Sequence, residues 1–322
     1  MKWNRKWSGS LPVWQPISAT LLAVFLTGCD RGLDEAPPAL PLEERTPKVL
    51  VIGIDGVRPD VLAEVPTPNI DALAIGGSFT ARTRTTTPSV SGPSWSSMLT
   101  GVWPDKHGVT NNEFGGRRYE DFPDFLTRIE SIRPELGTFA AVDWLPLMEI
   151  EGGGPTISDA VDVRVPMDGY ITGWAEGDVA VTAAAVAHLN EADPDALFVY
   201  LGNPDETSHQ HGSIGMEYRE AIAMSDQQIG HLVEAVRARP TFGEENWLVV
   251  ISTDHGRRED GGHGGDSPME MTTFILVSGP AAAIGTPAED TFIVDVAVTA
   301  LTHLGIPVDP SWQLDGRPVG LR

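Results

Sequence analysis

Six side chains that can bind metal ions stand in short segments of the sequence, several of them flanked by glycine. The set consists of three aspartates and three histidines: Asp55, Asp205, His209, Asp254, His255 and His263. Carboxylate oxygens and neutral imidazole nitrogens are common ligands of divalent metals. A single Asp after a strand could instead cap the next helix, and a single His could be solvated. Six together favour a site with room for two metal ions.

Ser91 is the candidate nucleophile. It directly precedes Gly92-Pro93 in a segment that continues to Gly101. Proline near the first turn predicts that a short helix begins here, which puts Ser91 at a helix N-terminus. Backbone N–H groups and the helix dipole favour an anion at that position, so it suits a nucleophile that attacks an anionic group.

The elements that must position these residues alternate along the chain. Nearly continuous apolar runs predict strands buried on both faces, at 49–54, 196–201, 247–251 and 273–277. Helical spacing of apolar residues predicts helices at 68–75, 122–132, 179–189, 216–237 and 294–304. This alternation predicts one α/β domain, a doubly wound, mostly parallel sheet with helices on both faces. The predicted ligands follow the carboxyl ends of strands, where such sheets carry their sites.

Taken together, these segments resemble the alkaline phosphatase superfamily, specifically its nucleotide pyrophosphatase/phosphodiesterase-like branch. The resemblance runs from about Val49 to the C-terminus. In that branch the nucleophile precedes a TG-x-x-P-x-x-HG stretch, met here by Thr100-Gly101 and His107-Gly108, and the register places it at Ser91. An Asn five residues after the HG histidine, which holds a phosphoryl oxygen in the family, falls on Asn112.

The family's metal motifs also have counterparts in this chain. Asp205, His209 and Gly212 meet its D-x-x-x-H-x-x-G element, Asp254 to Gly256 meet its DHG element, and His263 is its last histidine. The resemblance implies that Asp55, Asp254 and His255 hold the metal that also binds Ser91. It implies that Asp205, His209 and His263 hold the second metal, and that both ions are zinc.

The implied activity is hydrolysis of a small anionic phosphate ester, as in a phosphodiesterase or nucleotide pyrophosphatase, through a Ser91 phosphoenzyme. A phosphomonoesterase or phosphonate hydrolase of the same superfamily is an alternative, as is a sulfatase-like sulfate ester hydrolase. Ser91-Gly92-Pro93-Ser94 fits the sulfatase nucleophile segment, but Trp95 stands where that segment requires Arg. A non-catalytic metal-bound module is a third possibility, although the chain keeps both the nucleophile and all six ligands.

The first 47 residues predict export and attachment to a membrane. Residues 1–28 begin with basic residues and continue into a short apolar run, as in a secretory signal. Leu26-Thr27-Gly28-Cys29 resembles the lipobox of bacterial lipoproteins, so we expect a lipid anchor at Cys29, the only Cys of the chain. Residues 29–47 are charged and rich in proline, which predicts a tether. The catalytic domain is then expected at 48–322, on the periplasmic or cell-surface side.

The charge balance limits the partners of the protein. The 322 residues include 45 Asp and Glu against 22 Lys and Arg, a net charge of −23. Nucleic acid binding is not expected, because it requires a basic surface. The same field should repel long polyanions, which favours a small ester as substrate.

Overall fold

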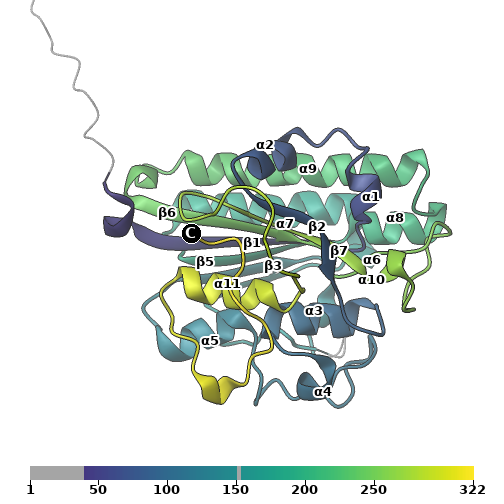
Figure 1. Ribbon diagram of the computed structural model, residues 1–322, viewed down its shortest axis with the longest axis horizontal. Coiled ribbons are helices and arrows are strands. Elements are labelled where there is room, and N and C mark those ends of the chain that lie inside the picture. The colour runs from purple at the N-terminus through teal and green to yellow at the C-terminus, as the bar shows by residue number, and fades with distance from the viewer. Residues whose placement is uncertain (1–39, 151–153) are drawn as a thin grey trace, which may run out of the picture. The chain divides into compact units, whose positions relative to one another are not determined.

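A seven-stranded sheet is the centre of the computed structural model, which describes residues 40–150 and 154–322 (Figure 1). The strands lie in the order β2-β7-β6-β1-β5-β3-β4. Their bounds are β1 Thr46–Ile54, β2 Gly77–Arg84, β3 Thr138–Val142, β4 Val163–Pro166, β5 Ala196–Leu201, β6 Glu245–Ser252 and β7 Thr272–Ser278. The pairs from β6 across to β4 are parallel, whereas β7 runs antiparallel to both of its neighbours. The predicted α/β fold with a mostly parallel sheet is therefore confirmed.

Helices cover both faces of the sheet. One layer contains α1 Pro59–Leu62, α2 Pro68–Ile75, α7 Trp174–Glu191 and α9 Met216–Arg237, and the opposite layer contains α3 Ser91–Thr100, α5 Phe125–Ile132 and α11 Asp295–His303 (Figure 1). Shorter helices are α4 Pro104–His107, α6 Gly169–Thr172, α8 Asn203–His211 and α10 Pro268–Met271. Single 3-10 turns are η1 Leu42–Glu44, η2 Leu145–Leu147, η3 Phe242–Glu244 and η4 Pro310–Trp312.

The central strand shows why the sheet is covered twice. Successive side chains of a strand point to opposite faces. Val49 and Val51 of β1 accordingly belong to the core under α3, α5 and α11, whereas Leu50 and Ile52 belong to the core under α2, α7 and α9. All four side chains are buried. Burial on both faces explains the unbroken apolar run that predicted this strand.

The described residues include the end of the predicted tether but not the segments before it. β1 begins at Thr46, two residues before the predicted start of the domain at Lys48, and η1 lies in what was predicted as tether. The signal at 1–28, Cys29 and most of the tether fall outside the described residues. Within the described part of the chain, no helix combines the length and apolarity that a membrane span needs.

Candidate active site

The first group of predicted ligands, Asp55, Asp254 and His255, lies where two neighbouring strands end. Asp55 follows β1, and Asp254 and His255 follow β6 after one intervening residue. Because β1 and β6 are parallel partners, their carboxyl ends meet. The Nε2 atom of His255 lies 3.5 Å from Asp55 Oδ1 and 3.4 Å from Asp254 Oδ2. We call these three residues the first trio; all are buried.

Each residue of the first trio directs one acceptor atom at the other two. Asp55 Oδ2 accepts hydrogen bonds from Trp95 Nε1 at 2.9 Å and Tyr200 Oη at 2.6 Å, and Asp254 Oδ1 accepts one from the Gly56 amide. Asp55 Oδ1 and Asp254 Oδ2 are buried without a hydrogen-bond donor among the described residues. His255 Nδ1 donates to the carbonyl of Gly256 at 3.0 Å, which leaves the lone pair on Nε2. Three converging buried acceptors fit a divalent cation.

Burial disfavours the ionised carboxylates of the first trio unless a cation is bound beside them. Burial, reinforced by the Asp254 and Asp205 charges, raises the pKa of Asp55 well above its usual range. Burial and the Asp205 charge raise the pKa of Asp254 to about 8. Burial and the proximity of His263 hold the pKa of His255 well below its usual value, so that imidazole is neutral and able to bind a metal. A bound divalent ion would favour both carboxylates in their ionised form.

The second group, Asp205, His209 and His263, lies beside the first and is called the second trio. Asp205 and His209 are one turn apart on α8, so both face the same way. His209 Nε2 is 3.2 Å from Asp205 Oδ2 and 3.2 Å from His263 Nε2. His263 Nδ1 donates to the main-chain carbonyl of Ser89 at 2.9 Å, which turns its other nitrogen toward the trio. Within each trio, the three potential ligand atoms lie within 4.8 Å of one another, which is close enough for them to bind one metal ion.

The start of α8 is held by a buried acid. Asp178 Oδ1, from α7, accepts hydrogen bonds from the amides of Gly202 and Asn203 at 2.7 and 3.3 Å. Burial raises the pKa of Asp178 to about 7, and its neighbour Asp143 is also buried. This contact fixes the helix that carries Asp205 and His209.

Arg257 is a site residue that the sequence reasoning missed. Its side chain is fully buried; Nη2 donates to Asp205 Oδ1 at 2.5 Å and lies 3.3 Å from His209 Nε2. Burial alone would raise the pKa of Asp205, but Arg257 and the surrounding histidines hold that pKa far below its usual value. An arginine in the run Arg257-Arg258-Glu259-Asp260 reads as a solvated charge. The available signal was its position, two residues after the predicted ligand His255.

Ser91 is the first residue of α3, as predicted, and it adjoins the first trio. Its Oγ lies 3.4 Å from His255 Nε2, and the residue is buried apart from 6% of its surface. The positive end of the α3 dipole therefore lies at the position where Ser91 would carry negative charge. Ser91 and the six predicted ligands come together in one place at the carboxyl edge of the sheet.

Asn112 lies next to the start of α3 and contacts its backbone. The Gly92 N–H donates to Asn112 Oδ1 at 2.7 Å. That bond occupies the backbone donor, and it orients the Asn112 side chain so that its Nδ2 group is the one left to face a ligand.

Other aromatic and histidine side chains in this part of the fold are buried or partly exposed. Trp95 is fully buried, and His107 is buried with its Nε2 against Ser97 Oγ at 2.9 Å. Trp144 is also in the core. Trp174 is partly exposed and packs edge to face with Tyr170, which is 70% exposed. Tyr170 lacked any motif, so sequence reasoning did not single it out.

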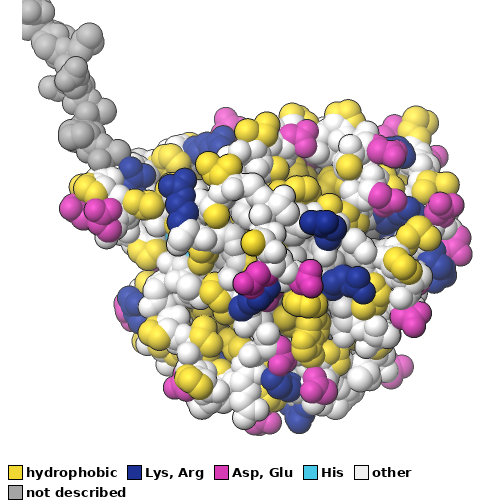
Figure 2. Space-filling model, viewed as in Figure 1, with side chains coloured by type: hydrophobic (Ala, Val, Ile, Leu, Met, Phe, Trp, Pro, Cys, Tyr) yellow, Lys and Arg dark blue, Asp and Glu magenta, His cyan; other side chains and the backbone are white. Residues whose placement is uncertain are grey.

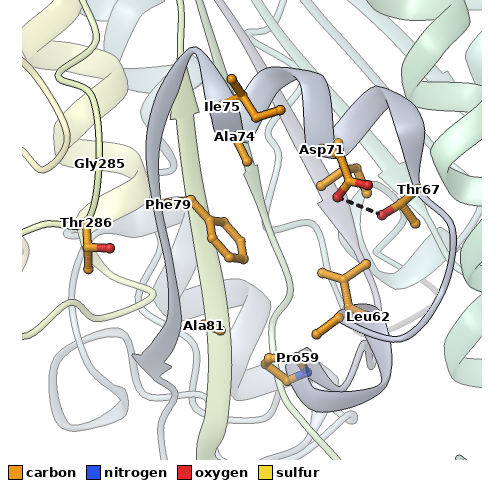
Figure 3. Close-up of a pocket in the computed structure, with 12 residues that line it drawn as sticks. Pro59, Leu62, Thr67, Asp71, Ala74, Ile75, Phe79, Ala81, Gly285 and Thr286 are labelled. Carbon is orange, nitrogen blue, oxygen red and sulfur yellow. Dashed lines mark hydrogen bonds between the residues drawn. The ribbon is translucent and has the colours of Figure 1, made fainter.

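A cavity of about 610 Å³ lies between α1, α2 and β2 and shares no residue with either trio. Figure 3 shows its apolar lining, with Leu62, Phe79 and Ile75 around it and a hydrogen bond of 3.4 Å from Thr67 to Asp71 at one side. It offers no metal ligand set. Volume alone would therefore misplace the chemistry of this molecule.

Comparisons with known sequences give matching family models and curated relatives. The family model described as type I phosphodiesterase / nucleotide pyrophosphatase matches residues 49–260. A second model, described as a domain of unknown function (DUF4983), matches residues 285–319. The chain is 27% identical over 233 residues to human ectonucleotide pyrophosphatase/phosphodiesterase family member 7, a match that covers 65% of this chain and 47% of that protein. The chain spans about half or less of the length of the curated relatives that head the comparison.

Solved structures share the fold at low sequence identity. Murine ectonucleotide pyrophosphatase / phosphodiesterase 5 superposes with a TM-score of 0.63 at 16% identity, covering 82% of this chain and 96% of that one. A 2-O GAG sulfatase superposes with a TM-score of 0.65 at 15% identity, covering 85% and 73%. The fold is thus common to phosphodiesterase-like proteins and to sulfatases, and the choice between these chemistries rests on the site.

Proposed function

Since the chain belongs to the type I phosphodiesterase / nucleotide pyrophosphatase family, we propose that it is a metal-dependent hydrolase of small phosphate esters with Ser91 as nucleophile. The observation that carries the proposal is the placement of Ser91 at a helix N-terminus, 3.4 Å from His255 and beside two trios of metal-ligand type. The family match supports phosphate ester chemistry, and the geometry supports the roles of individual residues.

Two divalent ions, which we propose to be zinc, would be held by Asp55, Asp254 and His255 and by Asp205, His209 and His263. Bound there, they would supply positive charge that lowers the pKa of the Ser91 hydroxyl and stabilises the leaving oxygen. Ser91 Oγ then attacks phosphorus, forming a Ser–O–P bond as the bond to the leaving group breaks. Asn112 Nδ2 donates to a non-bridging oxygen. Water cleaves the phosphoserine and restores Ser91.

Phosphate is favoured over sulfate by the residue at position 95. A sulfatase segment requires Arg there, whereas this chain has Trp95, fully buried and hydrogen bonded to Asp55. His255 also belongs to the first trio at a position where sulfatases often carry Asn. These two residues support a phosphate ester as substrate.

A phosphomonoester is the second candidate, because Arg257 changes the charge of the site. The six ligands carry three negative charges and two divalent ions would add four positive ones. Arg257 adds one more positive charge beside Asp205. The surplus then suits a dianionic monoester as well as a monoanionic diester, so the charge balance does not separate the two.

The proposed function predicts that Ser91→Ala abolishes turnover while the fold and metal content remain. We expect kcat for bis(p-nitrophenyl) phosphate to fall by at least about 10³-fold, since removing a covalent nucleophile removes its whole pathway. Ser94→Ala is the matched control, because Ser94 is buried in the same helix and only accepts a hydrogen bond from Thr85. The zinc content per chain is measured for the wild type and for both variants.

Wild-type turnover in metal-loaded Ser91→Ala would overturn the nucleophile assignment. The same assay with p-nitrophenyl phosphate and p-nitrophenyl sulfate ranks the alternatives. Sulfate turnover that survives zinc chelation and depends on calcium would replace the phosphatase proposal by a sulfatase.

We also propose that the protein is an exported lipoprotein anchored through Cys29, on the basis of the signal-like residues 1–28 and the lipobox-like segment. Cys29→Ser should move the protein from the membrane fraction to the soluble fraction, because the acylated residue is lost. Fractionation and detergent extraction of the two proteins measure this. A wild-type protein that stays soluble without detergent, with unchanged fractionation of Cys29→Ser, would disprove the anchor.

A further inference from the structure

The two trios differ in the charge that surrounds them. The first trio has two carboxylates and one imidazole, Asp55, Asp254 and His255, all essentially inaccessible. The second trio has a single carboxylate, Asp205, and its His209 side chain is 42% exposed. A cation therefore meets a more negative and less hydrated environment at the first trio than at the second.

Arg257 enlarges this difference. Its Nη2 is 2.5 Å from Asp205 Oδ1, and its Nη1 donates to the main-chain carbonyl of Asp205 at 2.7 Å. The guanidinium is always charged and fully buried, so solvent hardly screens it. It also lies 3.3 Å from His209 Nε2, a second ligand of the same trio. The only carboxylate of the second trio is thus neutralised by a fixed positive charge.

We infer that Arg257 makes the second trio a weak, exchangeable metal site, whereas the first trio binds its ion tightly. The inference rests on the proposed two-metal site and concerns the order in which it fills. Like charges a few ångströms apart repel strongly where the effective dielectric constant is low. An ion at the second trio experiences this repulsion from Arg257, and only one oxygen of Asp205 remains free of the guanidinium.

Arg257 acts here as a positioning and charge-setting residue. Both of its terminal nitrogens donate hydrogen bonds to Asp205, one to the main-chain carbonyl and one to the carboxylate, which fixes the guanidinium beside this residue. The adjacent Arg258 is different: its side chain is 44% exposed and pairs with Glu270 and Asp260. The two arginines therefore form a matched pair: Arg257 is hydrogen bonded to the second trio, and Arg258 has no such contact.

The test is a zinc competition titration of the full-length protein against chromophoric chelators, without an activity readout. The wild type should bind one zinc tightly and a second at least about tenfold more weakly. Arg257→Met removes the charge at similar length and should tighten the second zinc by about tenfold or more, with little change at the first. Arg257→Lys keeps the charge and should stay close to the wild type. Arg258→Met should leave both affinities unchanged.

The opposite results overturn the inference. Equal affinities in the wild type, or a second zinc that binds no better or binds more weakly in Arg257→Met, would show that Arg257 does not weaken the site. If Arg257→Met fails to fold, the rate of metal exchange in the wild type tests the inference instead. Zinc-loaded protein mixed with cadmium should exchange one ion fast and the other slowly. A single exchange rate for both ions would contradict the proposal. Protein that binds no zinc at all disproves the proposed function itself, so the two failures are distinguishable.

Discussion

Trp95 combines two roles in a single side chain. Its ring is fully buried and packs edge to face on Phe198 and Tyr200, at 6.0 and 5.0 Å between centroids. Its indole N–H donates a hydrogen bond to Asp55 Oδ2, which leaves Asp55 Oδ1 facing the other residues of the first trio. A residue of the hydrophobic core thus also orients a proposed metal ligand.

Trp95→Phe should weaken zinc binding at the first trio by about 10- to 100-fold, because an aromatic ring is kept but the hydrogen bond to Asp55 is lost. Competition titration measures the affinity. Trp144→Phe is the control: Trp144 is buried in the same core and stacks on Tyr200, but donates no hydrogen bond to a described residue. Equal losses in the two variants would assign the effect to packing.

The residues of the site were predictable to different degrees. The six predicted ligands and Ser91 lie in short motifs whose internal spacing is visible in the sequence, and the structure brings all seven together. Arg257 was not predictable, because its role depends on a contact with Asp205, 52 positions earlier. The engaged amide of Gly92 was missed for the same reason, since the loop that carries Asn112 is placed by tertiary packing.

The elements show a similar division. The predicted bounds of α2, α9 and β5 agree with the structure, because their apolar residues repeat at helical spacing or form one run. α8 has almost no apolar residue and β2 has no continuous apolar run, so neither pattern marked them. Both elements depend on neighbours instead: α8 begins against Asp178, and β2 pairs with β7.

The start of α3 and the loop at 111–116 fit closely, which predicts a sharp effect of Gly92→Ala. A Cβ at Gly92 would lie 2.5 Å from the main-chain oxygen of Asn111, so the loop with Asn112 must move away from Ser91. We expect kcat to fall about 10²-fold or more with zinc content unchanged. Gly115→Ala in the same loop, where a Cβ meets nothing within 4 Å, should be neutral. Wild-type kinetics of Gly92→Ala would contradict this placement of Asn112.

At the scale of the whole molecule, the net charge and the charge of the proposed metal-loaded site have opposite signs. The chain carries −23, and on the face drawn in Figure 2 acidic and basic side chains are interspersed. The proposed metal-loaded site is positive. An anionic substrate is therefore repelled at long range and attracted only at close range.

Raising the salt concentration should therefore speed capture of an anionic ester. Between about 20 and 200 mM NaCl the screening length shortens from about 20 Å to about 7 Å, so the long-range repulsion fades first. We expect kcat/KM for bis(p-nitrophenyl) phosphate to rise a few-fold, whereas a zwitterionic diester such as p-nitrophenyl phosphorylcholine should change little. A fall with salt for the anionic ester would show that the local positive field dominates at long range.

The link between Ser89 and the loop at 263–265 has a further consequence. The Ser89 carbonyl accepts from His263, and the Ser89 hydroxyl bridges the Gly264 amide and the Gly265 carbonyl. Three of these five atoms belong to the main chain, and Ser89 stands two residues before Ser91, the proposed nucleophile. The distance between Ser91 and the second trio is therefore set mainly by main-chain hydrogen bonds, and few side-chain substitutions can alter it.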